Sequence, residues 1–372
     1  MHRLTALCIA GLLAGCAVGP DYVEPDTKVA ERFDGVQAAV FSGEDALAQF
    51  WMQFGDETLD GLVGDALLAN HDLRIAVANV AAARALRGET RLDLAPTITA
   101  GGGYTDQRLA AGQAVPGVPR DQEIYDAGFD AVWELDFFGR VRRGIEASSA
   151  EVGAAEAALR DAQVIVTAEV TRTYFELRGL QQQLDVARRN VANQRTTLDL
   201  TTVRLEAGRG TELDTSRAQA QLSATLSTIG PLEAAVARSI HRLGVLTGRE
   251  PGALREVLGA QRDLPGLPAI AAVSDPATLL RRRPDIRVAE RELAASTARI
   301  GVAIADLFPR VTFTGSAGYV AETSDGLGDS GSDTHLIAPG ISWAALDLGR
   351  VRARIAASRA TTHGALARYE QT

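Results

Sequence analysis

A chain of 372 residues with a formal net charge of −9 lacks the basic surface that binds nucleic acid, so no nucleic-acid partner is expected. Hydrophobic residues make up 46% of the chain and aromatic residues only 5%, which favours long alanine-rich helices over a compact enzyme core. The five histidines show no metal-ligand spacing, and no nucleophile–base pair is recognisable. We therefore expect no enzyme, no metal site and no bound cofactor.

The N-terminus resembles a bacterial lipoprotein signal. Residues 4–14 form an apolar run that is too short to span a membrane and that ends in the box Leu13-Ala14-Gly15-Cys16. We expect cleavage to remove residues 1–15 and a lipid to be attached covalently to Cys16. By lipoprotein sorting convention, Ala17 directs the product to the outer membrane. An ordinary signal peptide with an incidental cysteine is the alternative.

One segment of the sequence occurs twice, with an offset of 213 residues. Residues 72–96 and 285–309 align without a gap, which pairs Gly88 with Gly301 and Pro96 with Pro309. Each copy is followed by stretches in which polar and apolar residues alternate, and then by a signature that both copies share. That signature reads WELDFFGRVRRGIEAS at 133–148 and WAALDLGRVRARIAAS at 343–358. Internal duplication decides the fold, and the repeating unit is predicted to be helix, strand, strand, helix.

Residues 125–136 alternate as a membrane-crossing strand does. Odd positions are apolar, with aromatic residues near both ends, whereas even positions include Asp126, Asp130 and Glu134. This period of two over roughly ten to twelve residues is typical of tilted strands in outer-membrane barrels. We expect the three acidic residues to face the lumen. The four predicted strands are 97–108, 122–136, 311–321 and 337–347.

Four strands cannot close a barrel, because closure needs about eight. Since open sheet edges are not tolerated in lipid, membrane strands in this chain would have to share a barrel with other copies. Three copies would give twelve strands, whereas two would close eight and leave little lumen. A soluble sheet with one wet face is the alternative.

Residues 140–246 predict a long helical hairpin. No proline interrupts residues 139–206, and apolar residues recur about every seven positions, as in a coiled coil. A helix of about 65 residues would measure roughly 100 Å. Gly208 is predicted to end it in the left-handed conformation, and Thr211 to cap a return helix that reaches Leu246 with Pro231 as a kink.

Five motifs together resemble the TolC-like outer-membrane factor family, in its lipoprotein branch of NodT type that serves RND pumps. They cover nearly the whole chain: residues 15–22 (GCAVGPDY), 50–56 (FWMQFGD), 133–140 (WELDFFGR), 174–178 (YFELR) and 282–286 (RRPDI). The resemblance implies a membrane β-barrel of four strands per chain continued by a long α-helical barrel. It also implies a homotrimer in the outer membrane that extends into the periplasm.

The same resemblance implies a passive duct that exports drugs and toxic compounds. Its partners would be an inner-membrane RND-type pump and a periplasmic membrane fusion (adaptor) protein, which would contact Ala207, Gly208 and Arg209 at the hairpin tip. In the family a second long hairpin follows the point that matches Thr372, so we expect a C-terminally truncated chain. A lipid-anchored periplasmic coiled-coil scaffold, or a non-functional truncated copy, is the alternative.

The expected domain division follows the duplication. After the signal peptide come a lipid-anchored periplasmic segment at 16–60, a first repeat at 61–248, an equatorial connection at 249–276 and an incomplete second repeat at 277–372.

Overall fold

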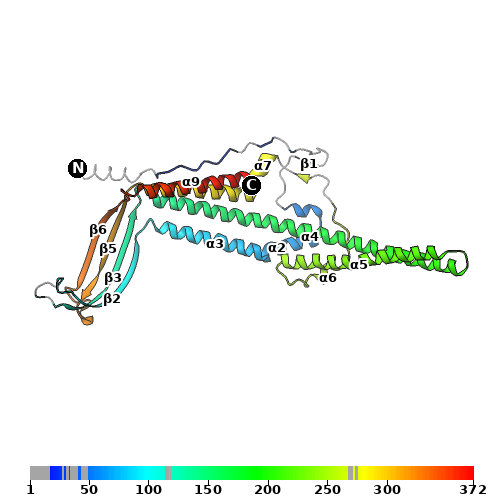
Figure 1. Ribbon diagram of the computed structural model, residues 1–372, viewed down its shortest axis with the longest axis horizontal. Helices are drawn as coiled ribbons and strands as arrows, with labels where there is room; N and C mark the ends of the chain where they lie inside the picture. Colours follow the sequence, from blue (N-terminus) through cyan, green and yellow to red (C-terminus); the bar gives the residue numbers. More distant parts are fainter. Residues whose placement is uncertain are drawn as a thin grey trace. The chain divides into compact units, whose positions relative to one another are not determined.

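The computed structural model describes residues 17–26, 29–30, 33, 41–42, 49–113, 117, 119–266, 271–272 and 275–372 (Figure 1). The expected signal peptide and the expected lipid site at Cys16 lie outside the described residues. The chain forms two compact units. Unit 1 comprises Met1–Thr27, Val80–Ala157 and Asp285–Thr372, and unit 2 comprises Lys28–Asn79 and Ala158–Pro284. Each unit contains residues from both sequence repeats.

The duplicated sequence folds twice into the same helix and strand. In the first copy these are α3 (His71–Leu92) and β2 (Thr97–Arg108), and in the second they are α8 (Pro284–Ala305) and β5 (Arg310–Ala321). Both helices have 22 residues and both strands have 12, so their bounds agree to the residue at the offset of 213. The sequence prediction for these elements is confirmed.

The shared signature makes the same contact in both copies. The ring N–H of Trp133 donates to the Leu94 carbonyl oxygen, and that of Trp343 donates to the Leu307 carbonyl oxygen, each at 3.0 Å. Leu94 and Leu307 are themselves equivalent positions of the repeat. Each tryptophan therefore ties the end of the second strand to the turn that precedes the first strand.

Unit 1 contains a four-stranded antiparallel sheet with the strand order β2-β3-β5-β6 (Figure 1). The central strand β3 (Asp121–Leu135) pairs with β2 on one side and with β5 on the other, which joins the two repeats. β6 (Asp333–Ser342) pairs with β5. Among the described strands, β2 and β6 each have a single neighbour, so each presents one edge of unpaired backbone groups.

The sheet has two chemically different faces, because directly paired residues in neighbouring strands share a face. The mainly apolar face contains Ile98, Tyr104, Tyr125, Phe129, Phe313, Tyr319, Ile337 and Ile341, together with the polar residues Asp333 and His335 of β6. The mainly polar face contains Thr97, Thr99, Asp126, Asp130, Thr312, Thr314, Ser316 and Thr334, together with the apolar residues Val132, Val320 and Leu336. The side chain of Phe129 on the apolar face is 63% exposed in the single chain.

The last strand differs from its predicted bounds of 337–347. β6 begins at Asp333, which pairs with Tyr319. The sequence prediction missed this start because residues 333–335 are all polar and show no alternation. β6 ends at Ser342, because β5, its partner among the described strands, begins at Arg310 and offers no backbone groups further on. β3 continues to Leu135 because β5 still pairs with it there, although its pairing with β2 ends at Val132.

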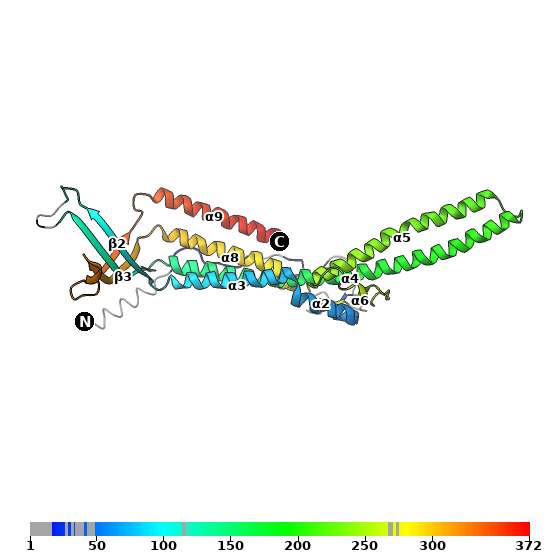
Figure 2. The ribbon, with the colours of Figure 1, turned by 90° about the horizontal axis from the view of Figure 1, so that it is seen from below.

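The helices of unit 1 pack through small side chains. α4 (Arg140–Glu206) begins in this unit, and α9 (Leu348–Gln371) lies beside α8, where Thr362 Oγ1 donates to the Ser296 carbonyl oxygen at 3.1 Å (Figure 2). Ala150 of α4 and two alanines of α8, Ala294 and Ala295, form a small buried cluster. Small residues allow the helix backbones to approach closely.

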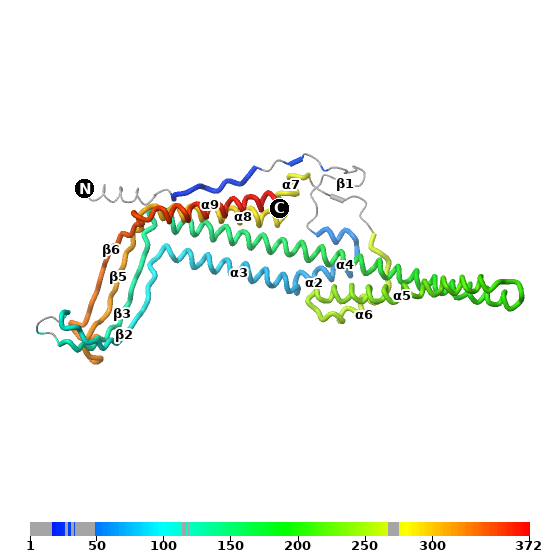
Figure 3. The backbone as a smooth tube through the Cα atoms, in the orientation of Figure 1, coloured from blue at the N-terminus to red at the C-terminus, as the bar shows by residue number. Residues whose placement is uncertain are grey.

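Unit 2 is built around the greater part of α4 and the return helix α5 (Glu212–Leu246), traced as a tube in Figure 3. α4 has 67 residues in all, about 100 Å at 1.5 Å per residue. Pro231 lies inside α5. The core of unit 2 holds Val170, Tyr174 and Leu177 of α4, all fully buried, with leucines of α2, α5 and the α6 region.

The remaining elements are short. They are β1 (Phe41–Ser42), η1 (Phe50–Phe54), α2 (Glu57–Ala69), α6 (Arg255–Leu258), β4 (Ala271–Ala272), α7 (Pro276–Arg282) and η2 (Ser324–Gly326). β1 and β4 form a two-residue parallel pair. No helix in the described part of the chain combines the length and the hydropathy that crossing a membrane requires.

Candidate functional site

The polar face of the sheet carries two carboxylates in mid-strand. Asp126 and Asp130 border a hollow of about 130 Å³, and Gly128 lies between them. Gly128 pairs with Gly318 across the β3–β5 ladder, and a Cβ on Gly318 would come within 2.4 Å of the Ala127 carbonyl oxygen. The glycines therefore permit a close backbone approach that leaves this face open beside the carboxylates.

Glu134, the third acidic residue expected in the lumen, is ion-paired. Its carboxylate accepts two hydrogen bonds from the Arg140 guanidinium, at 2.7 and 2.6 Å, across the junction between β3 and α4. A bidentate pair of this kind neutralises most of the carboxylate's field. Asp126 and Asp130 therefore dominate the negative charge of the polar face.

The tip between α4 and α5 is a compact turn. Gly208 has a φ of +67°, and Arg209 N–H and Gly208 N–H donate to the carbonyl oxygens of Arg204 and Leu205, the paired bonds of a Schellman motif. Thr211 then caps α5 in a capping box with Asp214. The sequence predictions for Gly208 and Thr211 are confirmed. Hydrogen bonds from Thr211 lower the pKa of the Asp214 carboxyl.

The expected docking residues lie on this turn. Ala207, Gly208 and Arg209 are all exposed, and each of their backbone N–H groups is satisfied within the turn. The tip therefore presents its side chains from a fixed backbone. That is the property that an end-on contact with another helical hairpin requires.

Two of the recognised motifs meet in unit 2. The Tyr174 hydroxyl of YFELR donates to the Asp56 carboxylate of FWMQFGD at 2.7 Å, and Phe54 and Phe175 stack edge to face with their centroids 4.9 Å apart. Asp56 also caps α2 by accepting from the Thr58 and Leu59 amides. Burial raises the pKa of the Asp56 carboxyl, but these hydrogen bonds outweigh it and lower the pKa.

The arginine of the same motif ties α4 to the chain beyond α6. Arg178 is fully buried and lies 4.9 Å from the centroid of the Tyr174 ring. It donates to Gln181 Oε1 at 2.8 Å and to the Ala260 carbonyl oxygen at 3.0 Å, while Gln181 donates to the Leu258 carbonyl oxygen at 2.7 Å. The motif is therefore a structural clamp.

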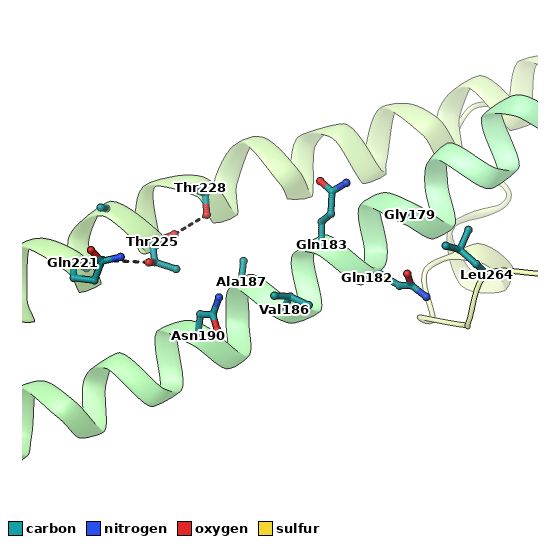
Figure 4. Close-up of a pocket in the computed structure, with 11 residues that line it drawn as sticks. Gly179, Gln182, Gln183, Val186, Ala187, Asn190, Gln221, Thr225, Thr228 and Leu264 are labelled. Carbon is teal, nitrogen blue, oxygen red and sulfur yellow. Dashed lines mark hydrogen bonds between the residues drawn. The ribbon is translucent and has the colours of Figure 1, made fainter.

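A groove of about 720 Å³ lies between α4 and α5 in unit 2. Figure 4 shows amide, hydroxyl and aliphatic side chains along it, among them Gln182, Gln183, Asn190 and Thr225. The Thr225 and Thr228 hydroxyls donate back to carbonyl groups of their own helix (Figure 4). No ionisable side chain lines the groove.

In the ranges that the structure describes, no three His, Cys, Asp or Glu side chains gather as metal ligands would. The ordered features are instead a two-faced sheet, a long hairpin with an exposed tip, and clamps that hold the helices.

An antiparallel sheet with one mainly apolar face, in a chain that also forms a long helical hairpin, fits a subunit of an outer-membrane channel. The chain belongs to the outer membrane efflux protein family, whose sequence profile matches residues 62–249 and 276–372. It is therefore a channel component of an efflux system in the outer membrane. The resemblance and the fold class expected from the sequence are confirmed.

Individual relatives agree with this assignment. The chain is 30% identical to nodulation protein T of Rhizobium leguminosarum bv. viciae, over all of this chain and 76% of that protein. It is 34% identical to the probable efflux pump outer membrane protein SepC of Pseudomonas putida, over 95% of this chain and 75% of that one. The solved structure of the outer-membrane channel OprN is similar with a TM-score of 0.87 at 43% identity, covering 96% of this chain and 79% of that one.

Proposed function

We propose that this chain forms a passive homotrimeric duct, held in the outer membrane by its sheet and by a lipid on Cys16. The observation that carries the proposal is the four-stranded sheet with one apolar face and, among the described strands, one unpaired edge on each of β2 and β6. Lipid offers no hydrogen-bond partner for such edges, so β2 of one copy must pair with β6 of the next. Three copies close a barrel wide enough for a lumen.

The apolar face then contacts lipid and the polar face lines the lumen. Asp126 and Asp130 make the lumen attractive to cations, whereas Glu134 adds little because Arg140 holds it. The duct moves molecules without chemistry of its own. The groove lined by amides and hydroxyls supports this view, since it lacks the ionisable groups that catalysis uses.

The hairpin tip docks to a periplasmic adaptor protein, and an RND-type inner-membrane pump supplies the energy. Ala207, Gly208 and Arg209 form the contact on the fixed backbone of the Schellman turn. The substrates are small molecules, as the efflux-pump names of several relatives suggest for those proteins.

The test is Arg209→Glu in the protein expressed from its native coding sequence. The substitution reverses one exposed charge and leaves both turn-forming residues in place. We expect normal trimers in the outer membrane, weak crosslinking to the adaptor and lost efflux. Arg195→Glu makes the same charge change at an exposed site of α4 before the tip and should keep both activities. Wild-type crosslinking and efflux after Arg209→Glu combined with Ala207→Trp would show that the tip is not the docking site.

A further inference from the structure

The segment 17–22, which directly follows the expected lipid site, is bound to the body of unit 1 by a buried arginine. Arg143 of α4 has a side chain that is 5% exposed. Its guanidinium donates to the carbonyl oxygens of Val18 and Gly19, at 3.1 and 3.3 Å, and to the Asp21 carboxylate at 2.7 Å. Its remaining partner is Glu146, at 2.7 Å. Most of the hydrogen bonds of this buried cation thus come from the segment.

Backbone contacts fix the segment at two further points. Gly19 lies so close to α8 that a Cβ on it would come within 2.5 Å of Gly301 Cα. A Cβ on Gly301 would come within 2.9 Å of the Val18 carbonyl oxygen. At the junction between β3 and α4, a Cβ on Gly139 would come within 2.6 Å of Ala17. Glycine is therefore required on both sides of the contact.

The far end of the segment is held by an aromatic side chain. Tyr22 packs against the buried alanine cluster of α4 and α8, and the Arg291 guanidinium lies 5.8 Å from its ring centroid. Arg291 is itself ion-paired to the buried carboxylate of Glu290. Burial, together with this neighbouring carboxylate, raises the pKa of the Tyr22 hydroxyl.

In the described part of the chain, the contacts that hold the segment have no counterpart at the equivalent positions of the other copy of the repeat. Gly88, the equivalent of Gly301 in the first copy, is exposed, and a Cβ added there would meet nothing within 4 Å. In the shared signature, Arg143 and Glu146 correspond to Ala353 and Ala356. The copies diverge at the residues that hold the segment, so the contact is not a general property of the repeat.

From these contacts we infer that unit 1 contains a docking site for the chain's own N-terminal segment, formed by Gly139, Arg143, Glu290 and Gly301. The site holds Ala17, and with it the start of the mature chain, at the junction between the sheet and α4. It thereby sets the level at which the N-terminal anchor meets the membrane. That last consequence rests on the proposed lipid at Cys16, whereas the docking itself does not.

The test is cleavage by chymotrypsin after Tyr22 in the purified detergent-solubilised protein. A docked Tyr22 is protected, and cleavage follows the population in which the segment has opened. The product is the shortened chain beginning at Val23, measured by intact mass. Because the assay involves neither lipid nor transport, its failure is distinct from a failure of the proposed function.

Gly301→Ala should displace the segment and accelerate this cleavage at least about tenfold. Gly88→Ala is the matched control, since it makes the same change in the equivalent helix and should leave the rate as in the wild type. Asp21→Ala removes one ion pair of an exposed carboxylate and should accelerate cleavage roughly two- to fivefold.

An unchanged rate in folded Gly301→Ala, or an equal acceleration in Gly88→Ala, would overturn the inference. Should Gly301→Ala fail to fold, Asp21→Ala decides the matter. The Asp21 side chain is 88% exposed and contributes nothing to the core, so cleavage at the wild-type rate in Asp21→Ala would also overturn the inference.

Discussion

Replacing Phe129 by arginine is the sharpest probe of the two faces of the sheet. Phe129 lies four residues from both Tyr125 and Trp133, about 14 Å along the strand from each, so it marks the middle of the apolar face. An arginine at the bilayer midplane of a barrel costs about 2–4 kcal/mol. Because the side chain is exposed in the single chain, little of that cost comes from lost packing within the protomer.

The control places the same charge at the same depth on the other face. Ser316 pairs with Asp130, next to Phe129 in the ladder, so Ser316→Arg brings a cation opposite a carboxylate. Urea unfolding of the protein in lipid vesicles, followed by heat-modifiable mobility, should show a loss of about 2–4 kcal/mol for Phe129→Arg and less than about 1 kcal/mol for Ser316→Arg. Equal losses at the two positions would refute the assignment of the faces.

Three further changes probe other elements. Tyr174→Phe removes the bond to the Asp56 carboxylate and should lower the helical stability of unit 2 by about 1.5–3 kcal/mol in denaturant melts; no change would refute the clamp. The pKa of Asp56 is lowered by folding, so its contribution is full above the unfolded value of about 3.9 and is lost as the pH falls through the native value. Acid titration of the same melts should therefore show a shallower decline in Tyr174→Phe than in the wild type. Thr211→Ala should destabilise the start of α5 by about 1 kcal/mol and speed hydrogen exchange there. Unchanged hydrogen exchange would show that the Thr211 cap does not stabilise the helix. Neutralising Asp126 and Asp130 together should lower cation preference in single-channel recordings, and unchanged selectivity would place these residues outside the lumen.

Much of the fold follows from local sequence. The strands β2 and β5 could be bounded because a proline precedes each and because the duplication gives two readings of the same pattern. The hairpin tip was predictable because Gly208 and Thr211 have specific backbone roles. These features depend on residues within a few positions of each other, which is the range over which propensity and periodicity act.

Long-range pairing was not predictable in the same way. β6 ends where its partner begins, which no pattern inside β6 reveals. Asp56 and Tyr174 are 118 positions apart, and Arg143 and Asp21 are 122 apart. Their motifs were recognised singly, but only the packing of helices brings them together. For the contact of Arg143, the sequence offered only an arginine beside Gly144 at the start of a helix. Such an arginine suggests a buried partner but does not identify it.

The most direct test of the proposed duct is electrical recording from the purified protein in a planar lipid bilayer. We predict discrete, ATP-independent current steps with cation preference, produced by an oligomer with three times the mass of one chain. A protein that attaches to the bilayer as a monomer and gives no current steps at any applied voltage would contradict the proposal.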